Sequence, residues 1–522
     1  MKVIKPKAMA ATGSFARASS GTFFGSNGLL QTAATNVLRL QYNPITLAFN
    51  GLLIETASTN LILQSETFDN ASWTKTNASA TSNSVNAPTG TLLADTITAS
   101  ATDGNFSQTF TAVSGTVYTW SCFVRAGTSN TVRFSCQATA AVFVVTFNLA
   151  TATTTTVSGT GTASITAVGN GWFRCVATAT ATASGTGAFQ IIVPTNGQTA
   201  FLYGAQLEAR SSASSYIVTV GSTVTRAADV ISGADTGLVY SNAIEVNAAW
   251  SSATTYAKDA LVDYQEHIYQ SLVNSNTNNI PSVVGSTFWT QIGPDNRHAM
   301  FDGQISTLTT SSTPLIVVLS TGIINSTALL GLVGSSVTVH LTDGASSSVV
   351  YSKTNGLDGT VLNDWYMYFF EPFVQKGEVV LTDLPPYNSG YLVMILSGGS
   401  TVSIGELMVG TVYALGEHDL EQGASIGIID YSRKDTDPDT GKTTFVERAF
   451  SKRMSGQFLI ENGSLNGVQR ILSDIRAVPS VFIGSEGEDY SPLVVYGFYR
   501  DFSIDIAYPT KSFCRLEVEG LI

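Results

Sequence analysis

The sequence predicts an all-β protein built as a multidomain string, and three observations support this prediction. Only 12% of the 522 residues are charged, about half the share that is typical of soluble domains. Thr, Ser, Ala, Gly and Asn take their place, and β-branched and small polar residues disfavour helices. Hydrophobic residues make up 44% and aromatic residues 10% of the chain, which is enough for packed cores and argues against disorder.

The charge balance and the cysteines exclude several classes of protein. The 26 Lys and Arg against 38 Asp and Glu give a net charge of −12, which disfavours a general binder of nucleic-acid phosphates. The first ten residues hold lysines but no apolar segment, so they do not resemble a secretory signal. The cysteines are too few for a disulfide framework and lie in apolar stretches, so we expect buried free thiols at Cys122, Cys136, Cys175 and Cys514.

The pattern along the chain divides it into six segments. Residues 1–59 carry short apolar pieces and turn signals, which predicts an extended N-terminal arm that needs a neighbour to pack against. Residues 60–229 hold short alternating runs at hairpin spacing, which predicts a β-sandwich of jelly-roll type. The expected strands of this sandwich are Gly104–Thr111, Thr116–Arg125, Thr131–Ala138, Phe143–Leu149, Trp172–Ala179, Phe189–Val193 and Ala200–Leu207.

The next three segments are less regular. Residues 230–246 are expected to form a linker or an exchanged strand, residues 247–295 a small aromatic-rich β-module, and residues 296–408 a further β-sandwich. The uncharged stretch Thr313–Gly334 resembles a membrane span, but its β-branched residues favour strands joined by a turn at Ile323–Ser326. The strands expected in this part lie near Leu315–Leu319, Ser336–Leu341, Trp365–Phe370, Glu378–Leu381, Tyr391–Leu396 and Thr401–Leu407.

Residues 409–522 form the last segment, a C-terminal β-rich domain that is denser in charge than the rest of the chain. Arg433–Arg453 is dense in both signs, and Gln469–Val478 is the clearest helical stretch of the chain. Residues 1–408 are poor in charge by comparison. This asymmetry indicates that the last segment provides a polar docking surface.

Residues 12–229 carry several motifs in a fixed order. They are Phe15-Ala-Arg-Ala-Ser, Gly51-Leu-Leu-Ile-Glu, Thr59-Asn-Leu-Ile-Leu-Gln-Ser-Glu, Gly171-Trp-Phe-Arg-Cys and Tyr203-Gly-Ala-Gln-Leu-Glu. In this order the motifs resemble the N-terminal region of tail and head-fibre proteins of tailed bacteriophages. The resemblance implies the carbohydrate-binding-like β-sandwich that is found in phage fibres and spikes.

Residues 249–293 resemble the small chitin- and cellulose-binding β-module. The motifs are Ala249-Trp-Ser-Ser-Ala-Thr-Thr-Tyr256, Val262-Asp-Tyr264, His267-Ile-Tyr269 and Phe288-Trp289-Thr-Gln-Ile-Gly. In that family one or two exposed aromatic rings stack on sugar rings. The resemblance therefore implies a set of candidate glycan-binding residues, namely Trp250, Tyr256, Tyr264, Tyr269 and Trp289.

The same five rings have a second interpretation from the residues alone. Aromatic faces cover the apolar C–H patches of sugars, and Trp250 and Trp289 could supply such a platform. A unit this small also needs its aromatic residues as its only core. Both the sugar-binding and the core interpretation stay open at this point.

A third resemblance lies in the last segment. Its motifs are Gly427-Ile-Ile-Asp-Tyr-Ser-Arg-Lys434, Val446-Glu-Arg-Ala-Phe-Ser-Lys-Arg-Met454 and Tyr496-Gly-Phe-Tyr-Arg-Asp-Phe. They are similar to the C-terminal region of tail proteins from transposable and related tailed phages. The resemblance implies a particle protein and no defined chemistry.

Features that suggest catalysis or metal binding are weak. Gly423-Ala-Ser425-Ile-Gly427 has the spacing of a nucleophile elbow with His418 nearby, but the sequence continues as a strand where the elbow needs a helix. Asp435–Glu447 resembles a calcium loop whose Gly and Glu fall one position late, so a polar hairpin tip is the better interpretation. The histidines lack ligand spacing, and no repeated coils of a β-helix occur. We expect no enzyme, no metal and no cofactor.

These inferences predict a structural virion appendage protein of a tailed phage, such as a tail-fibre, tail-tip or head-fibre protein, made in the host cytoplasm and located in the virion. It is expected to attach to the particle and to contribute to recognition of host-surface polysaccharide. The alternative is a purely structural adaptor between tail, baseplate or head and a separate receptor-binding protein. The expected partners are other copies of itself, as a homotrimer or a hexameric ring, and other phage proteins, without nucleic acid or membrane insertion.

Overall fold

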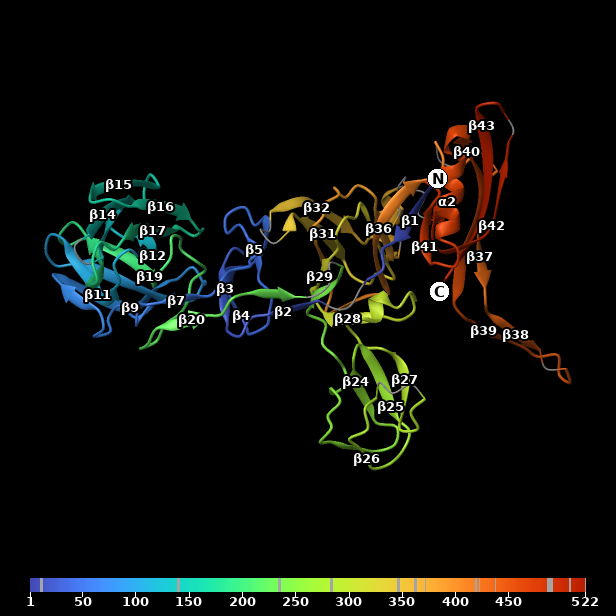
Figure 1. Cartoon of the computed structure of the whole chain (residues 1–522), viewed down its shortest axis with the longest axis horizontal. Helices are drawn as coiled ribbons and strands as arrows, with labels where there is room; N and C mark the ends of the chain where they lie inside the picture. Colours follow the sequence, from blue (N-terminus) through green and yellow to red (C-terminus); the bar gives the residue numbers. More distant parts are fainter. Residues whose placement is uncertain are drawn as a thin grey trace. The chain divides into compact units, whose positions relative to one another are not determined.

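The chain forms two compact units of β-structure (Figure 1). The sandwich unit comprises Ser14–Ser232 with Ala345–Val349, and the terminal unit comprises Met1–Gly13, Gly233–Gly344 and Val350–Ile522. Strands dominate both units, which confirms the predicted all-β multidomain fold. The computed structural model describes residues 1–9, 13–138, 141–232, 236–281, 285–344, 348–360, 364–370, 372–417, 420–421, 423–436, 438–485, 492–506 and 508–521.

The sandwich unit contains two six-stranded antiparallel sheets with a shared core. The first has the order β16 (Thr162–Ala167), β17 (Trp172–Thr180), β12 (Val117–Ala126), β19 (Thr199–Glu208), β10 (Leu92–Ala99) and β9 (Ala78–Asn86). The second has the order β15 (Thr153–Ser158), β14 (Ala141–Asn148), β13 (Thr131–Ala138), β18 (Gly185–Val193), β11 (Gly104–Ala112) and β8 (Thr74–Thr76). The orders β10-β19-β12-β17 and β11-β18-β13-β14 are those of a jelly roll, which confirms the prediction.

Period-2 alternation in these strands sends every second side chain into the core between the sheets. Trp73 and Trp120 are fully buried there, and so are Cys122, Cys136 and Cys175. All four cysteines of the chain are free and buried, as predicted. Burial raises the pKa of the Cys122 thiol to about 12, so this thiol is inert at neutral pH.

The segment predicted as an arm contributes to both units and finds its neighbours within the same chain. Most of it forms the start of the sandwich unit and pairs with the end of that unit through two short strand pairs. The pairs are β2 (Ser14–Ala16) with β21 (Val230–Ser232), and β7 (Ser58–Asn60) with β20 (Val224–Arg226). Two hairpins lie between them, β3 (Gly21–Phe24) with β4 (Leu30–Ala33) and β5 (Leu40–Tyr42) with β6 (Phe49–Leu52).

The terminal unit is built on a nine-stranded antiparallel sheet. Its order is β33 (Glu378–Leu381), β30 (Ser326–Leu330), β36 (Glu406–Ala414), β1 (Lys2–Pro6), β41 (Ser480–Ile483), β42 (Val494–Asp505), β43 (Lys511–Gly520), β40 (Phe450–Glu461) and β37 (Ser425–Asp430). The N-terminal strand β1 thus lies inside the sheet and pairs with β36 and β41. Helix α2 (Leu465–Asp474) contributes Val468 and Leu472 to the core over β1, β40 and β43.

A second sheet of the terminal unit has five strands. They are β22 (Gly237–Ser241), β29 (Leu315–Ser320), β34 (Tyr391–Ser397), β31 (Ser336–Thr342) and β32 (Val349–Gly356). Its apolar side chains share a core with Leu329, Leu407 and Val409 of the nine-stranded sheet. The uncharged stretch Thr313–Gly334 holds the strands β29 and β30, as predicted. Among the described residues, no helix has the length and apolarity that a membrane span requires.

The helical elements differ from prediction in two places. The strand expected at Trp365–Phe370 is wrong, because this segment forms the helix α1. The Asp364 side chain caps this helix by accepting the Met367 N–H at 2.8 Å. The predicted helix Gln469–Val478 is found as α2, which ends at Asp474 because Ala477 has a φ of 59° and Pro479 follows.

The expected linker 230–246 contains the strands β21 and β22.

Candidate functional site

The five predicted glycan-binding residues lie in the small aromatic module, which is inserted in the terminal unit between β22 and β28 (Thr309–Ser312). The module consists of one three-stranded sheet and one short strand pair. The sheet contains β24 (Leu261–Tyr264), β25 (His267–Ser271) and β27 (Trp289–Pro294), and the pair is β23 (Thr255–Tyr256) with β26 (Asn276–Thr277).

Two of the five rings hold this module together. Trp289 is only 3% exposed, and its indole Nε1–H donates a hydrogen bond to the Asn279 carbonyl at 2.8 Å. The Tyr256 ring meets Trp289 edge to face, with 5.3 Å between the ring centroids. The Tyr256 hydroxyl accepts the Ser251 N–H at 2.7 Å. Trp289 is therefore a core residue whose ring faces are not open to a sugar, and Tyr256 is a half-buried ring that packs against it.

The other three rings form a half-buried row. Trp250 meets Tyr264 at 5.5 Å and 77°, and Tyr264 meets Tyr269 at 6.5 Å and 67°. Among the described residues, the buried Nε1 of Trp250 has no hydrogen-bond partner. An indole N–H without an acceptor is unusual in a packed site, because burial removes it from water. The rings of this row keep part of their surface exposed, as Tyr256 does.

Titratable groups lie where the module joins the rest of the terminal unit. The His298 Nδ1 lies 2.6 Å from the Asp295 carboxylate. Burial opposes the charged form of His298, but the hydrogen bond and charge of Asp295 outweigh it and raise the pKa of this imidazole. A cavity of about 220 Å³ lies beside them, lined by His267, His298 and Asp302 among others. Within the described residues, no group of three or more His, Cys, Asp or Glu side chains is arranged to hold a metal ion.

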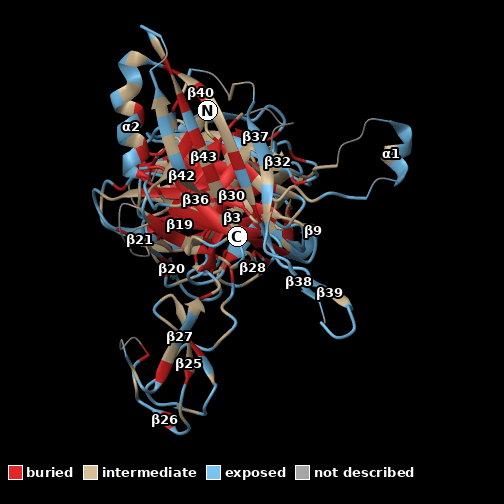
Figure 2. Cartoon of the chain, turned by 90° about the vertical axis from the view of Figure 1, so that its right-hand side faces the viewer, coloured by how far each residue is buried: buried red, intermediate tan, exposed pale blue. Residues whose placement is uncertain are grey.

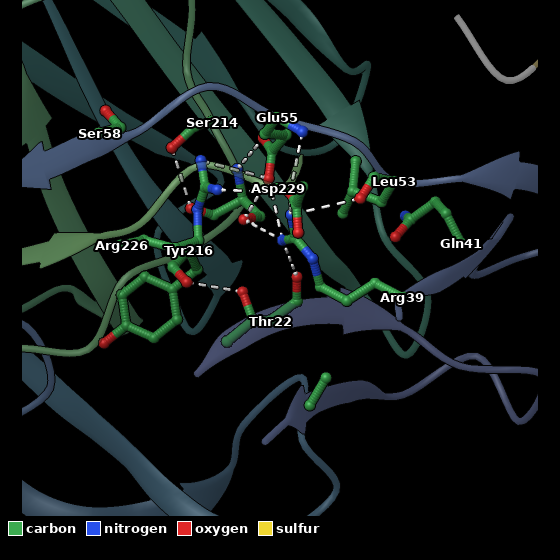
Figure 3. Close-up of polar contacts among 12 residues, drawn as sticks. Thr22, Arg39, Gln41, Leu53, Glu55, Ser58, Ser214, Tyr216, Arg226 and Asp229 are labelled. Carbon is green, nitrogen blue, oxygen red and sulfur yellow. Dashed lines mark hydrogen bonds and ion pairs between the residues drawn. The ribbon is translucent and has the colours of Figure 1, made fainter. Parts of the chain in front are cut away.

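A buried cluster of charges ties the arm to the end of the sandwich unit (Figure 3). The Asp229 carboxylate accepts hydrogen bonds from Arg17 Nη1 at 3.1 Å and from Arg39 Nη2, and Arg226 Nη1 lies 3.7 Å away. The Glu55 carboxylate lies 2.9 Å from Arg39 Nη1 and 3.5 Å from Arg226 Nη2. We refer to these five residues as the arginine cluster.

Three further bonds to backbone carbonyls hold the arginine cluster, although the buried Nε atoms of Arg39 and Arg226 have no partner among the described residues. Arg17 donates to the Ala34 carbonyl, Arg39 to the Thr22 carbonyl and Arg226 to the Thr56 carbonyl. Burial alone would raise the pKa of Glu55, but the Arg226 charge and hydrogen bonds from Ser215 hold it below its usual value. The cluster is internally paired and serves structure. Its sequence signal was available, because Arg17, Arg39 and Glu55 are isolated charges in a charge-poor arm.

A groove of about 890 Å³ opens in the terminal unit where β30, β33, β40 and β42 approach one another. Leu330, Val374, Phe450 and Leu521 contribute apolar surface to it. Lys452 Nζ in the groove lies 2.5 Å from the Glu378 carboxylate, and Asp358 and Lys376 also line the groove. Sequence reasoning missed this groove, because its walls come from segments that are far apart along the chain.

The weak catalytic motifs do not gain support. Ser425 is the first residue of strand β37, where an elbow would need a sharp turn, and His418 lies outside the described residues. The calcium-like stretch carries the hairpin of β38 (Arg433–Thr436) and β39 (Thr443–Val446). Asp437 of that stretch also lies outside the described residues.

Comparisons with known proteins do not assign this chain to a family. No protein family matches the sequence, and no curated protein matches it. Among solved structures, the N-terminal tandem of CBM22 modules from Paenibacillus barcinonensis Xyn10C is 7% identical, with a TM-score of 0.21, over 68% of this chain and 98% of that chain. The GH78 rhamnosidase of Bacillus sp. GL1 is 8% identical, with a TM-score of 0.15, over 73% of this chain and 36% of that chain. At these scores neither likeness carries an argument.

Proposed function

We propose that this chain is a structural virion appendage protein of a tailed phage, in which the terminal unit attaches to the particle and the sandwich unit and aromatic module are displayed. The observation that carries the proposal is the insertion of both displayed parts into the terminal unit. The sandwich unit begins and ends on the paired strands β2 and β21, and the aromatic module lies between β22 and β28. Such a connection leaves the inserted domain free to present its surface.

Two of the motifs that resemble phage fibre proteins supply residues to the arginine cluster. Phe15-Ala-Arg17 and Gly51-Leu-Leu-Ile-Glu55 supply Arg17 and Glu55 to the arginine cluster. A motif that supplies internally paired charges contributes to architecture, and this favours a structural protein over an enzyme. Incubation with purified host polysaccharide should accordingly leave its chain length unchanged.

The virion location is tested by labelling intact particles. An epitope inserted at Gly197, a sandwich-unit turn where a Cβ would meet nothing within 4 Å, should be labelled by antibody on purified virions. The same epitope at Gly441, at the tip of the β38–β39 hairpin, should be hidden on intact particles and accessible on the free protein. Absence of the chain from purified virions would contradict the whole proposal, and labelling at Gly441 on virions would contradict docking through the terminal unit.

Glycan recognition is the finer part of the proposal and falls to the half-buried row Trp250, Tyr264 and Tyr269. Replacing Trp250 or Tyr269 by Ala should weaken binding to host cells or purified surface polysaccharide about tenfold or more, which is about 1.4 kcal/mol. Ile292→Ala is the matched control, because Ile292 is an exposed apolar residue on β27 of the same module. If the folded Trp250 and Tyr269 variants bind as the wild type does, the purely structural adaptor is the better description.

A further inference from the structure

The terminal unit carries an aromatic projection that the proposed function does not use. It consists of the helix α1 together with Phe373. Figure 2 shows α1 as an exposed helix that stands clear of the sheets. Five aromatic side chains of the projection are between 62% and 79% exposed, namely Trp365, Tyr366, Phe369, Phe370 and Phe373. A run of rings this exposed is characteristic of an interaction surface.

The projection is held outward by hydrogen bonds at its base. The Gly359 N–H donates to the Val374 carbonyl at 2.8 Å, and the Lys376 N–H donates to the Leu357 carbonyl at 2.9 Å. The Val374 N–H donates to the Thr360 hydroxyl at 3.1 Å. These bonds join the two segments that lead to and from α1. The rings are therefore presented on a fixed base, which lowers the entropic cost of an interface.

The groove described above begins at the same base. Val374, which closes the ladder of hydrogen bonds, also lines the groove together with Phe450 and Leu521. One chain therefore presents both a protruding aromatic surface and an apolar groove, and a second copy can supply each with its complement.

The size and charge of the two surfaces favour protein over lipid. Aromatic side chains bury about 150–250 Å² each, so five rings at this exposure offer on the order of 500–900 Å², which matches the roughly 800 Å² per partner of a standard interface. Two cations, Lys376 and Lys452, and two anions, Asp358 and Glu378, line the groove, so its charges balance. A lipid-binding loop needs an excess of neighbouring cations, whereas the start of this projection carries Asp358 and Asp364, in a chain of net charge −12.

We propose that the aromatic projection of one copy occupies the groove of a second copy of this chain. Because the two surfaces differ, the contact is head to tail, and repetition around an axis closes a ring. The inference goes beyond the proposed function and does not depend on it. A monomeric chain that is found in virions would overturn the inference alone, and a ring-forming chain that is absent from virions would overturn the proposed function alone.

The test uses the full chain and two variants with complementary defects. The projection variant carries Tyr366→Ser and Phe370→Ser, and the groove variant carries Phe450→Arg. All three positions are more than half exposed, so near-ultraviolet circular dichroism should be unchanged. Val220→Ser, at an exposed residue of the sandwich unit, is the matched control. Sedimentation velocity over a wide range of concentration then measures the mass of each protein.

We expect oligomers for the wild type and the control, and monomers for each variant alone. A mixture of the two variants should form a complex of two chains and no larger species, because only one intact projection and one intact groove can meet. A monomeric wild type, variants that associate as the wild type does, or a mixture that stays monomeric would each overturn the inference. Flotation of a monomeric wild type with vesicles of phosphatidylcholine and phosphatidylglycerol would overturn it in favour of a lipid surface.

Discussion

In most proteins charged side chains are exposed and aromatic side chains are buried. The arginine cluster departs from the first rule and the aromatic projection departs from the second. The cluster buries the charges of five side chains in the sandwich unit, whereas the projection exposes five rings in the terminal unit. Burial of charge is tolerated where every group is paired and hydrogen-bonded. The difference teaches that the sandwich unit completes its own contacts, while the terminal unit leaves apolar surface for another molecule.

Two buried carboxyl groups extend the comparison. Asp229 faces three guanidinium groups. Glu406 in the terminal unit accepts the Gly303 N–H at 3.0 Å, and among the described residues no cation lies within ion-pair distance of it. Burial raises the pKa of Glu406 to about 8, and the neighbouring Asp302 charge adds to the rise. A buried carboxyl group thus lies among cations in one unit, whereas the site of the other favours its neutral form.

The largest expected effect is the loss of the central carboxylate of the arginine cluster. Asp229→Ala leaves three buried guanidinium groups without their shared partner and should destabilise the sandwich unit by about 3–5 kcal/mol. Urea unfolding followed by tryptophan fluorescence measures this change. Asp103→Asn is the control, because Asp103 pairs with Arg133 at the surface, Asn tolerates its φ of 58°, and the change should cost only about 0–1 kcal/mol. Equal effects of the two substitutions would contradict the structural role of the cluster.

The aromatic module should respond almost as strongly to the loss of its core ring. Trp289→Ala removes a buried indole and is expected to cost about 3–5 kcal/mol. Hydrogen exchange should then accelerate in β24, β25 and β27 and stay unchanged in the sandwich unit. Ile292→Ala at the surface of the same module should stay within about 0.5 kcal/mol of the wild type. Normal protection of the module in the Trp289 variant would show that its core lies elsewhere.

The stability of the terminal unit should depend on pH through Glu406. Its pKa is raised from 4.5 to about 8 on folding, so the folded state binds the proton more tightly than the unfolded state does. Stability is therefore greatest below about pH 4.5 and falls as the pH rises toward 8, by at most about 1.4 kcal/mol per pH unit. Glu406→Gln should remove this decline and raise the melting temperature near pH 8. Parallel pH profiles for wild type and variant would refute the assignment.

The smallest expected effect concerns the exposed rings. Tyr366→Ser with Phe370→Ser should change the stability of the monomer by no more than about 0.5 kcal/mol, because these rings make few contacts that unfolding would break. Phe134→Ala in the sandwich core, a matched loss of one ring, should cost about 3–5 kcal/mol. A large loss of stability in the projection variant would mean that its own chain covers these rings.

The sandwich strands and the buried cysteines could be predicted because their signal is local. Alternation of apolar and polar residues repeats within each strand, and the turns between strands carry their own residues. The aromatic module was recognisable from the spacing of its rings. The burial of Trp289 and the partial exposure of the other four rings follow from packing across strands and were not visible in the sequence.

The remaining features depend on contacts between distant residues. The arginine cluster joins Arg17 to Asp229, and no periodicity links these positions. The helix α1 was predicted as a strand because its aromatic residues favour strands in isolation, whereas the Asp364 cap favours a helix. The groove needs Leu330, Phe450 and Leu521 together, and only the completed sheet places them side by side.

The position of β1 inside the nine-stranded sheet has a consequence for biosynthesis. The sandwich unit is almost wholly contiguous in sequence, so it can fold on the ribosome soon after it emerges. The strand Lys2–Pro6 cannot pair at that stage, because its partners β36 and β41 are translated long after it. This strand therefore leaves the ribosome well before the strands that pair with it, and it needs protection from mispairing in the interval.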